Sequence, residues 1–107
     1  MSEDPKFGAL RKGFLEFLVL RIINGSTMYA ADILKKLAAT DFATQEGTLY
    51  PLLSRLRREG LLDYRWQESE AGPPRKYYRL TGAGQRQLAD FDAHWERLNQ
   101  TIDSLGS

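Results

Sequence analysis

The sequence predicts a mainly helical domain with a small β-hairpin, an α+β fold. Three observations predict it: apolar residues recur at helical spacing up to residue 56, alternate from residue 62, and return at heptad spacing from residue 88. The chain has 107 residues, 42% of them hydrophobic and 27% charged, as in one small globular domain. Such a domain buries a modest core, so a second copy is a reasonable way to cover further apolar surface.

Two helices are expected in the first forty residues. From Leu10 to Ile23 apolar residues occupy nearly every helical face, which is typical of a helix buried in a core or shared with a partner. Asn24-Gly25 tolerates positive φ and is expected to end this helix, after which Ser26 or Thr27 is expected to cap the next. The inner stripe of this second helix, which is expected to end near residues 39–41, is Ala30, Ile33, Leu34 and Leu37.

A third helix is expected from a Thr44 cap to Gly60, with a proline inside it. Its core face is Leu49, Leu52, Leu53 and Leu56, at i, i+3, i+4 and i+7. On a helical wheel Pro51 falls opposite these leucines and near the start, where a missing N–H costs least. A local bend or a loosened first turn is the expected consequence.

The period then changes to the alternation of strands. Leu62, Tyr64 and Trp66 face one way, so we expect Tyr64 and Trp66 to pack as core beneath an antiparallel hairpin. The polar segment 68–74 (ESEAGPP) is expected to be the loop. The returning strand carries Tyr77 and Tyr78, which alternate in direction, so at most one of them packs inward.

The last helix carries a narrow apolar seam. Thr81 is its expected cap, although Gly82 and Gly84 weaken the first turn. The seam residues follow the 3-4-3-4-3 spacing of a heptad a/d pattern, which is typical of paired helices: Leu88, Phe91, Trp95, Leu98, Ile102 and Leu105.

This order of elements is that of a winged helix-turn-helix. We therefore predict a winged helix-turn-helix domain over residues 1–81 and an added C-terminal helix over residues 82–107. An α+β domain with the same elements packed differently fits the pattern as well.

Positive charge is concentrated in the middle of the chain. The net charge is only +1, but residues 44–81 hold seven Lys and Arg against five acids. The outward face of the third helix is narrow at its start and cationic at its end, which suits a DNA major groove, and the hairpin adds cations beside it. The alternative is a solvated helix whose arginines pair with nearby acids. The predicted DNA-contact residues are Gly47, Thr48, Tyr50, Pro51, Ser54, Arg55, Arg58, Arg65, Arg75 and Lys76.

Several segments of the chain carry a family resemblance. In order, they are Glu46-Gly47-Thr48-Leu49-Tyr50-Pro51-Leu52-Leu53, Arg55-Leu56, Glu59-Gly60-Leu61-Leu62, Trp66, Gly72-Pro73-Pro74-Arg75-Lys76-Tyr77-Tyr78 and Leu80-Thr81-x-x-Gly84. In this order and spacing they resemble PadR-like transcriptional regulators, and the resemblance extends from Gly13 onward. One segment departs from it: Met28-Tyr29-Ala30-Ala31-Asp32-Ile33 stands where the family often has Leu-Tyr-Gly-Tyr-Glu-Ile.

The resemblance implies a winged-helix homodimer that binds a pseudo-palindromic operator, usually as a repressor, and releases it when an effector binds. The C-terminal helix makes such a dimer with help from Phe14 and Leu18 of the first helix. A single final helix resembles the short-tailed branch of the family. Trp95 occupies a place comparable to a tryptophan on which some relatives stack flat aromatic drugs, although a plain seam residue is the alternative.

Other classes of function find little support in the composition. With one histidine, no cysteine and no glycine-rich phosphate loop, we expect no enzyme, no cofactor and no metal site. The longest apolar run, residues 14–23, is too short to span a bilayer, so we expect a cytoplasmic protein with no membrane partner. The expected partners are double-stranded DNA, a second copy of the chain and a small hydrophobic or aromatic effector. A winged-helix protein-interaction module that does not bind DNA is the alternative.

Overall fold

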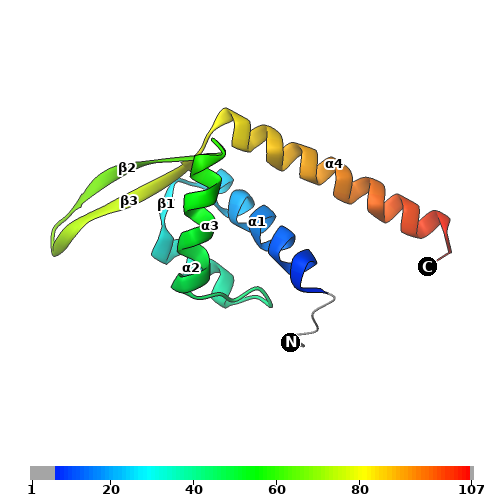
Figure 1. The fold of residues 1–107 in the computed structure, drawn as a ribbon, viewed down its shortest axis with the longest axis horizontal. Helices are drawn as coiled ribbons and strands as arrows, with labels where there is room; N and C mark the ends of the chain where they lie inside the picture. Colours follow the sequence, from blue (N-terminus) through cyan, green and yellow to red (C-terminus); the bar gives the residue numbers. More distant parts are fainter. Residues whose placement is uncertain (1–6, 107) are drawn as a thin grey trace.

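The computed structural model describes residues 7–106, and these form four helices and a three-stranded antiparallel sheet (Figure 1). In chain order the elements are α1 (Gly8–Gly25), β1 (Met28–Tyr29), α2 (Ala30–Ala38), α3 (Glu46–Arg58), β2 (Leu62–Ser69), β3 (Gly72–Leu80) and α4 (Gly82–Ser104). The expected order of three helices, a hairpin and a final helix is confirmed. Residues 1–6 of the predicted winged helix-turn-helix domain (1–81) and residue 107 of the predicted C-terminal helix (82–107) lie outside the described part of the chain.

The core lies where α1, α2 and α3 meet the base of the sheet. Val19, Ile33, Leu49, Leu53 and Leu56 are completely buried there, one or more from each helix. Burying a leucine side chain contributes about 1.5–3 kcal/mol, so this cluster holds the three helices in fixed relation. The predicted stripes of α2 and α3 are thus the faces that pack.

The junction between the first two helices differs from the prediction. Neither Ser26 nor Thr27 caps α2: Ser26 is the C-cap residue of α1, and the chain runs extended from there into β1, where Met28 and Tyr29 pair with Tyr78 and Tyr77. The edge of β3 thus takes up residues that local signals assigned to a helix. Helix α1 ends at Gly25, as predicted, but not through positive φ, since the described residues adopt positive φ only at Gly60 and Gly106.

The cap of α2 comes from inside the helix. The Asp32 carboxylate accepts a hydrogen bond of 3.1 Å from the Tyr29 N–H, which satisfies one free donor of the first turn. The helix therefore begins at Ala30 instead of at the expected cap.

Helix α3 begins one residue later than the expected cap allows and runs through its proline. Gln45, and not Thr44, is the N-cap residue, and Pro51 lies inside the helix on its exposed side. The helix continues to Arg58, and a bend at Pro51 stays a prediction. Gly60, with φ of 78°, follows the helix end, as predicted.

The hairpin of β2 and β3, called the wing below, is longer than predicted. Segment 68–74 is mostly strand, because β2 runs to Ser69 and β3 starts at Gly72. Two prolines are tolerated in β3 because β1 pairs only with Tyr77 and Tyr78, which leaves that edge of β3 open at Pro73 and Pro74. The wing therefore extends well beyond the helical core (Figure 1).

Helix α4 starts against the body and then leaves it. The Thr81 hydroxyl accepts the Gly84 N–H at 3.0 Å, so the predicted cap is confirmed. Gly84 is buried so closely that a Cβ there would collide with the carbonyl oxygen of Leu61. Helix α4 runs beside α1, and its C-terminal half projects away from the wing (Figure 1).

Candidate nucleic-acid interface

The outward face of α3 is open along its length. Its exposed residues are Gly47, Thr48, Tyr50, Pro51, Ser54 and Arg58. Leu49, Leu53 and Leu56 on the opposite face are completely buried. The wheel therefore assigned both faces of this helix correctly, and six of the predicted DNA-contact residues share one accessible surface.

Arg55 occupies a different place from the other predicted contacts. Its guanidinium donates to Glu16 on α1 at 3.0 Å and to Glu59 at 2.8 Å. These bonds, the one to Glu16 first, raise the pKa of Arg55. Because two carboxylates already offset its charge, Arg55 joins α1 to α3, whereas Arg58 has no ion pair among the described residues. A contact of Arg55 with DNA stays a prediction.

The cations of the wing are divided between its two faces. In the register of the hairpin, Trp66 pairs with Lys76 and Arg65 with Tyr77, so Lys76 lies on the face toward α3 and Arg65 on the opposite face. Arg65 is held 5.7 Å from the ring centre of Tyr77. The predicted basic cluster is therefore not one continuous patch.

Arg75 belongs to the outer face by register but reaches back toward α2. Its guanidinium lies 3.9 Å from the ring centre of Tyr29, a cation–π contact that holds it at the edge of the sheet. Near the base of the wing, Arg79 donates to Asp63 at 3.2 Å. The Tyr64 N–H and Arg79 together lower the pKa of Asp63.

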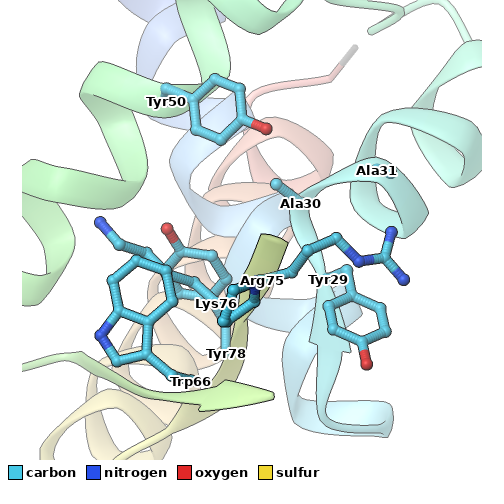
Figure 2. Close-up of a pocket in the computed structure, with 9 residues that line it drawn as sticks. Tyr29, Ala30, Ala31, Tyr50, Trp66, Arg75, Lys76 and Tyr78 are labelled. Atoms are coloured by element: carbon cyan, nitrogen blue, oxygen red, sulfur yellow. The ribbon is translucent and has the colours of Figure 1, made fainter. Parts of the chain in front are cut away.

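A cleft of about 280 Å³ lies between the start of α2, helix α3 and the wing; we call it the wing cleft (Figure 2). It is lined by Tyr29, Ala30, Ala31, Tyr50, Trp66, Pro74, Arg75, Lys76 and Tyr78. A second hollow of about 230 Å³ shares Lys76 and Tyr78 with it and is lined also by Leu53, Ser54, Arg57, Arg58 and Tyr64. No acidic side chain lines either hollow, so this side of the protein is cationic and aromatic.

Trp66 does not pack as core, contrary to the prediction. Its side chain is 61% exposed, whereas Tyr64 is half-buried and Tyr78 is buried. The prediction that Tyr64 and Trp66 share one face of the strand is correct. The wing extends beyond the helices, however, so no helix covers its inner face at Trp66. Arg57, which lies 4.7 Å from the Tyr64 ring centre, is another lining residue that the prediction did not name. On a helical wheel Arg57 lies at the flank of the outward face of α3, and this position could have identified it as a lining residue.

The second notable surface lies between α1 and α4. Trp95 meets Phe14 edge to face at 5.5 Å, and Phe91 stacks on Phe17 at 3.9 Å. Phe14, Phe17, Leu18, Phe42, Phe91 and Trp95 line a hollow of about 320 Å³, called the aromatic hollow below, with no charged side chain in its lining. Phe42 was not predicted, because a lone aromatic residue in a loop has no periodic signal.

The seam of α4 is buried at its start and open at its end. Leu88 was predicted to contact a partner chain. It is instead buried in the core of its own chain, so this prediction is wrong. Leu98, Ile102 and Leu105 remain exposed, by 48%, 43% and 80%. An ion pair between Arg21 and Asp92 joins α1 to α4 beside the aromatic hollow. The open half of the seam is apolar surface that this chain does not cover.

Comparison with known proteins identifies relatives along most of the chain. A sequence profile described as the transcriptional regulator PadR-like family matches residues 19–90. The structure is similar to that of a PadR-like transcription factor from Bacteroides fragilis, with 44% identity, a TM-score of 0.87, and 96% of this chain and 100% of that one covered.

Two further proteins are similar to most of the chain. A PadR-like transcriptional regulator from Bacillus cereus is 35% identical, with a TM-score of 0.79 over 92% of this chain and 96% of that one. An uncharacterized protein from Lysinibacillus sphaericus is 27% identical over 95 residues, which are 86% of this chain and 87% of that one. Within residues 7–106, no helix combines the length and the apolar character needed to cross a bilayer.

Proposed function

The chain belongs to the transcriptional regulator PadR-like family, and we propose that it represses transcription by binding a pseudo-palindromic operator as a homodimer. One observation carries the proposal. The exposed face of α3, with Ser54 and Arg58 open to solvent, lies beside a wing cleft whose lining includes cations and no acid. Such a surface suits a duplex, because its helix fits a major groove while its cations offset phosphate charge.

On this proposal the predicted contacts divide into two groups. Thr48, Tyr50 and Ser54 offer hydrogen-bonding groups toward base edges, and Gly47 and Pro51 keep the start of the helix narrow enough to enter the groove. Arg58, Lys76 and Arg75 supply phosphate contacts beside the wing cleft, and Arg65 supplies one from the opposite face of the wing. Such contacts fix register without reading sequence. Arg55 supports α3 from behind through Glu16.

The homodimer in this proposal uses the open half of the α4 seam. Leu98, Ile102 and Leu105 expose apolar surface at heptad spacing, and a second copy would cover it. Phe14 and Leu18 of α1 line the aromatic hollow next to that seam, so they would contribute to the same interface. Two copies joined there would present two recognition helices to two half-sites, as a palindromic operator requires.

We further propose that a flat, apolar effector binds in the aromatic hollow. Trp95 and Phe14 offer ring surfaces there, and the lining carries no charge. Titration of a planar hydrophobic compound should quench tryptophan fluorescence and weaken DNA binding by the same protein. An identical titration of the Trp95→Ala variant would remove Trp95 from this role.

The experiment for the main proposal is selection of duplexes bound by the protein from a random pool, followed by affinity measurements over a salt series. We expect an inverted repeat, a dimer by sedimentation, and an affinity that falls steeply with salt because phosphate contacts release counterions. The Lys12→Gln variant, which removes one exposed cation near the start of α1, is the matched control and should bind normally. No enrichment of any duplex, or an affinity independent of salt, would contradict DNA binding and favour a protein-interaction module.

A further inference from the structure

Trp66 presents a large apolar side chain where the structure offers it no cover. It is 61% exposed, and its ring is oriented by an edge-to-face contact with Tyr64 at 5.8 Å. Figure 2 shows the ring at the edge of the wing cleft, on the side of the wing that faces α3. Tryptophan is enriched at interfaces because its large apolar ring also carries a polar N–H, so a ring oriented beside a cleft suits a contact with a partner.

A cation lies directly next to this ring. Lys76 is the cross-strand partner of Trp66, and its ammonium lies 5.6 Å from the Trp66 ring centre and 4.6 Å from that of Tyr64. The two rings hold the ammonium by cation–π attraction without neutralising it. The wing thus offers an apolar plate and a positive charge side by side.

The remaining walls of the cleft leave room for a ligand. Tyr50, exposed by 45%, forms the wall on α3, while Ala30 and Ala31 at the start of α2 are small. Arg75 reaches the far side (Figure 2). A ligand that suits this cleft has an apolar, roughly flat part and an adjoining anion.

A deoxyribose with its phosphate has this composition. In a duplex the bases are stacked and paired, so sugars and phosphates are the parts of a strand that pass along a protein surface. We propose that the wing cleft holds one deoxyribose–phosphate unit of the operator backbone, with Trp66 packed on the sugar and Lys76 on the adjacent phosphate. This inference rests on the proposed DNA binding and adds a contact residue that no periodicity predicted.

The two contacts differ in their salt dependence, which makes them separable. Removing a phosphate contact lowers the slope of log affinity against log salt by about 0.9, whereas removing an apolar contact leaves the slope unchanged. Because the substitution removes this contact from both protomers of the proposed homodimer, we expect Lys76→Gln to reduce the slope by about 1.8. We expect Trp66→Ala to weaken binding about tenfold at every salt concentration, and Trp66→Phe to weaken it less.

A fluorescence measurement provides an independent readout. In a Trp95→Phe background, Trp66 is the sole tryptophan, so its emission reports its own surroundings. The selected duplex should change this emission, and the change should saturate with the same affinity as the binding isotherm. Circular dichroism should show the same fold and melting temperature for Trp66→Ala and Trp66→Phe as for the wild type, since Trp66 is exposed.

The outcomes separate this inference from the proposed function. If the wild-type protein binds DNA and Trp66→Ala binds equally well at every salt concentration, the inference is overturned and DNA binding stands. The inference is also overturned, and DNA binding stands, if the emission of Trp66 does not change when the protein binds the duplex. A wild-type protein without affinity for any duplex overturns both.

Discussion

The two tryptophans of this chain stand in opposite surroundings. Trp66, on the wing, has a lysine ammonium 5.6 Å from its ring centre, whereas Trp95, on α4, meets Phe14 at 5.5 Å in a hollow without charged lining. Both are large and partly exposed, by 61% and 44%. The same side chain therefore marks two surfaces that suit different partners, a polyanion at the wing and apolar matter at α4.

The difference shows that exposure of an aromatic residue does not by itself indicate its partner. The charge of the neighbouring side chains indicates which partner suits the aromatic residue. Burying a cation against an apolar partner is costly, whereas placing it against a phosphate is favourable. Separate substitutions should accordingly disturb the two surfaces in separate ways.

The largest effect should come from charging the apolar surface. Leu98→Glu combined with Ile102→Glu would place carboxylates in the proposed seam, where their desolvation costs several kcal/mol. We expect a monomer by analytical ultracentrifugation and a loss of DNA affinity of about 100-fold or more, since each half-site would then bind alone. Gln100→Glu, on the opposite side of α4, is the control. A dimer that survives the double substitution would place the interface elsewhere.

A large loss of stability should follow from Gly84→Ala, at the junction between the wing and α4. The added methyl would collide with the Leu61 carbonyl oxygen and the Leu80 side chain, and such overpacking costs about 1–3 kcal/mol or more. Thermal melting followed by circular dichroism would measure it. Gly13→Ala, in open space on α1, should instead stabilise by about 0.5–1 kcal/mol. Equal melting temperatures for both variants would contradict the close packing at Gly84.

Two neighbouring arginines of α3 should respond differently. Arg58→Ala removes a proposed phosphate contact from each protomer of the homodimer, so we expect about tenfold weaker DNA binding and a salt slope reduced by about 1.8. Arg55→Ala removes a guanidinium already paired with Glu16 and Glu59, so we expect an unchanged slope and a loss of stability of at most about 1 kcal/mol. A reduced slope for Arg55→Ala would show that Arg55 leaves its carboxylates for DNA.

The smallest effect should be an acid sensitivity at the base of the wing. The pKa of Asp63 is lowered in the folded chain, so its contribution to stability is present above the pKa of the unfolded state and is lost as pH falls through the carboxyl range near and below 3.8. Asp63→Asn should therefore flatten the dependence of melting temperature on pH in this range. Asp103→Asn, in the last turn of α4, is the control. An unchanged profile would show that the bonds to Tyr64 and Arg79 do not favour the charged form.

Local periodicity predicted the elements and most of their buried faces. The leucines of α3 and the cap at Thr81 could be identified because they depend on residues three or four positions apart. The short strand β1 could not, since two residues carry no period and pair only because β3 offers them an edge. The length of the wing was missed because prolines usually end a strand, and here they lie on an open edge.

The sequence by itself determined the order of the four helices and the wing, which faces of α3 are apolar and cationic, and which family the chain resembles. All of these depend on neighbours along the chain. The tertiary structure alone decided that Arg55 pairs with Glu16, that Lys76 and Arg65 lie on opposite faces, that Leu88 is buried in its own chain, and that Trp66 is uncovered. Those outcomes depend on how elements that are distant in the sequence are placed against one another in space. Residue spacing along the chain does not encode that placement.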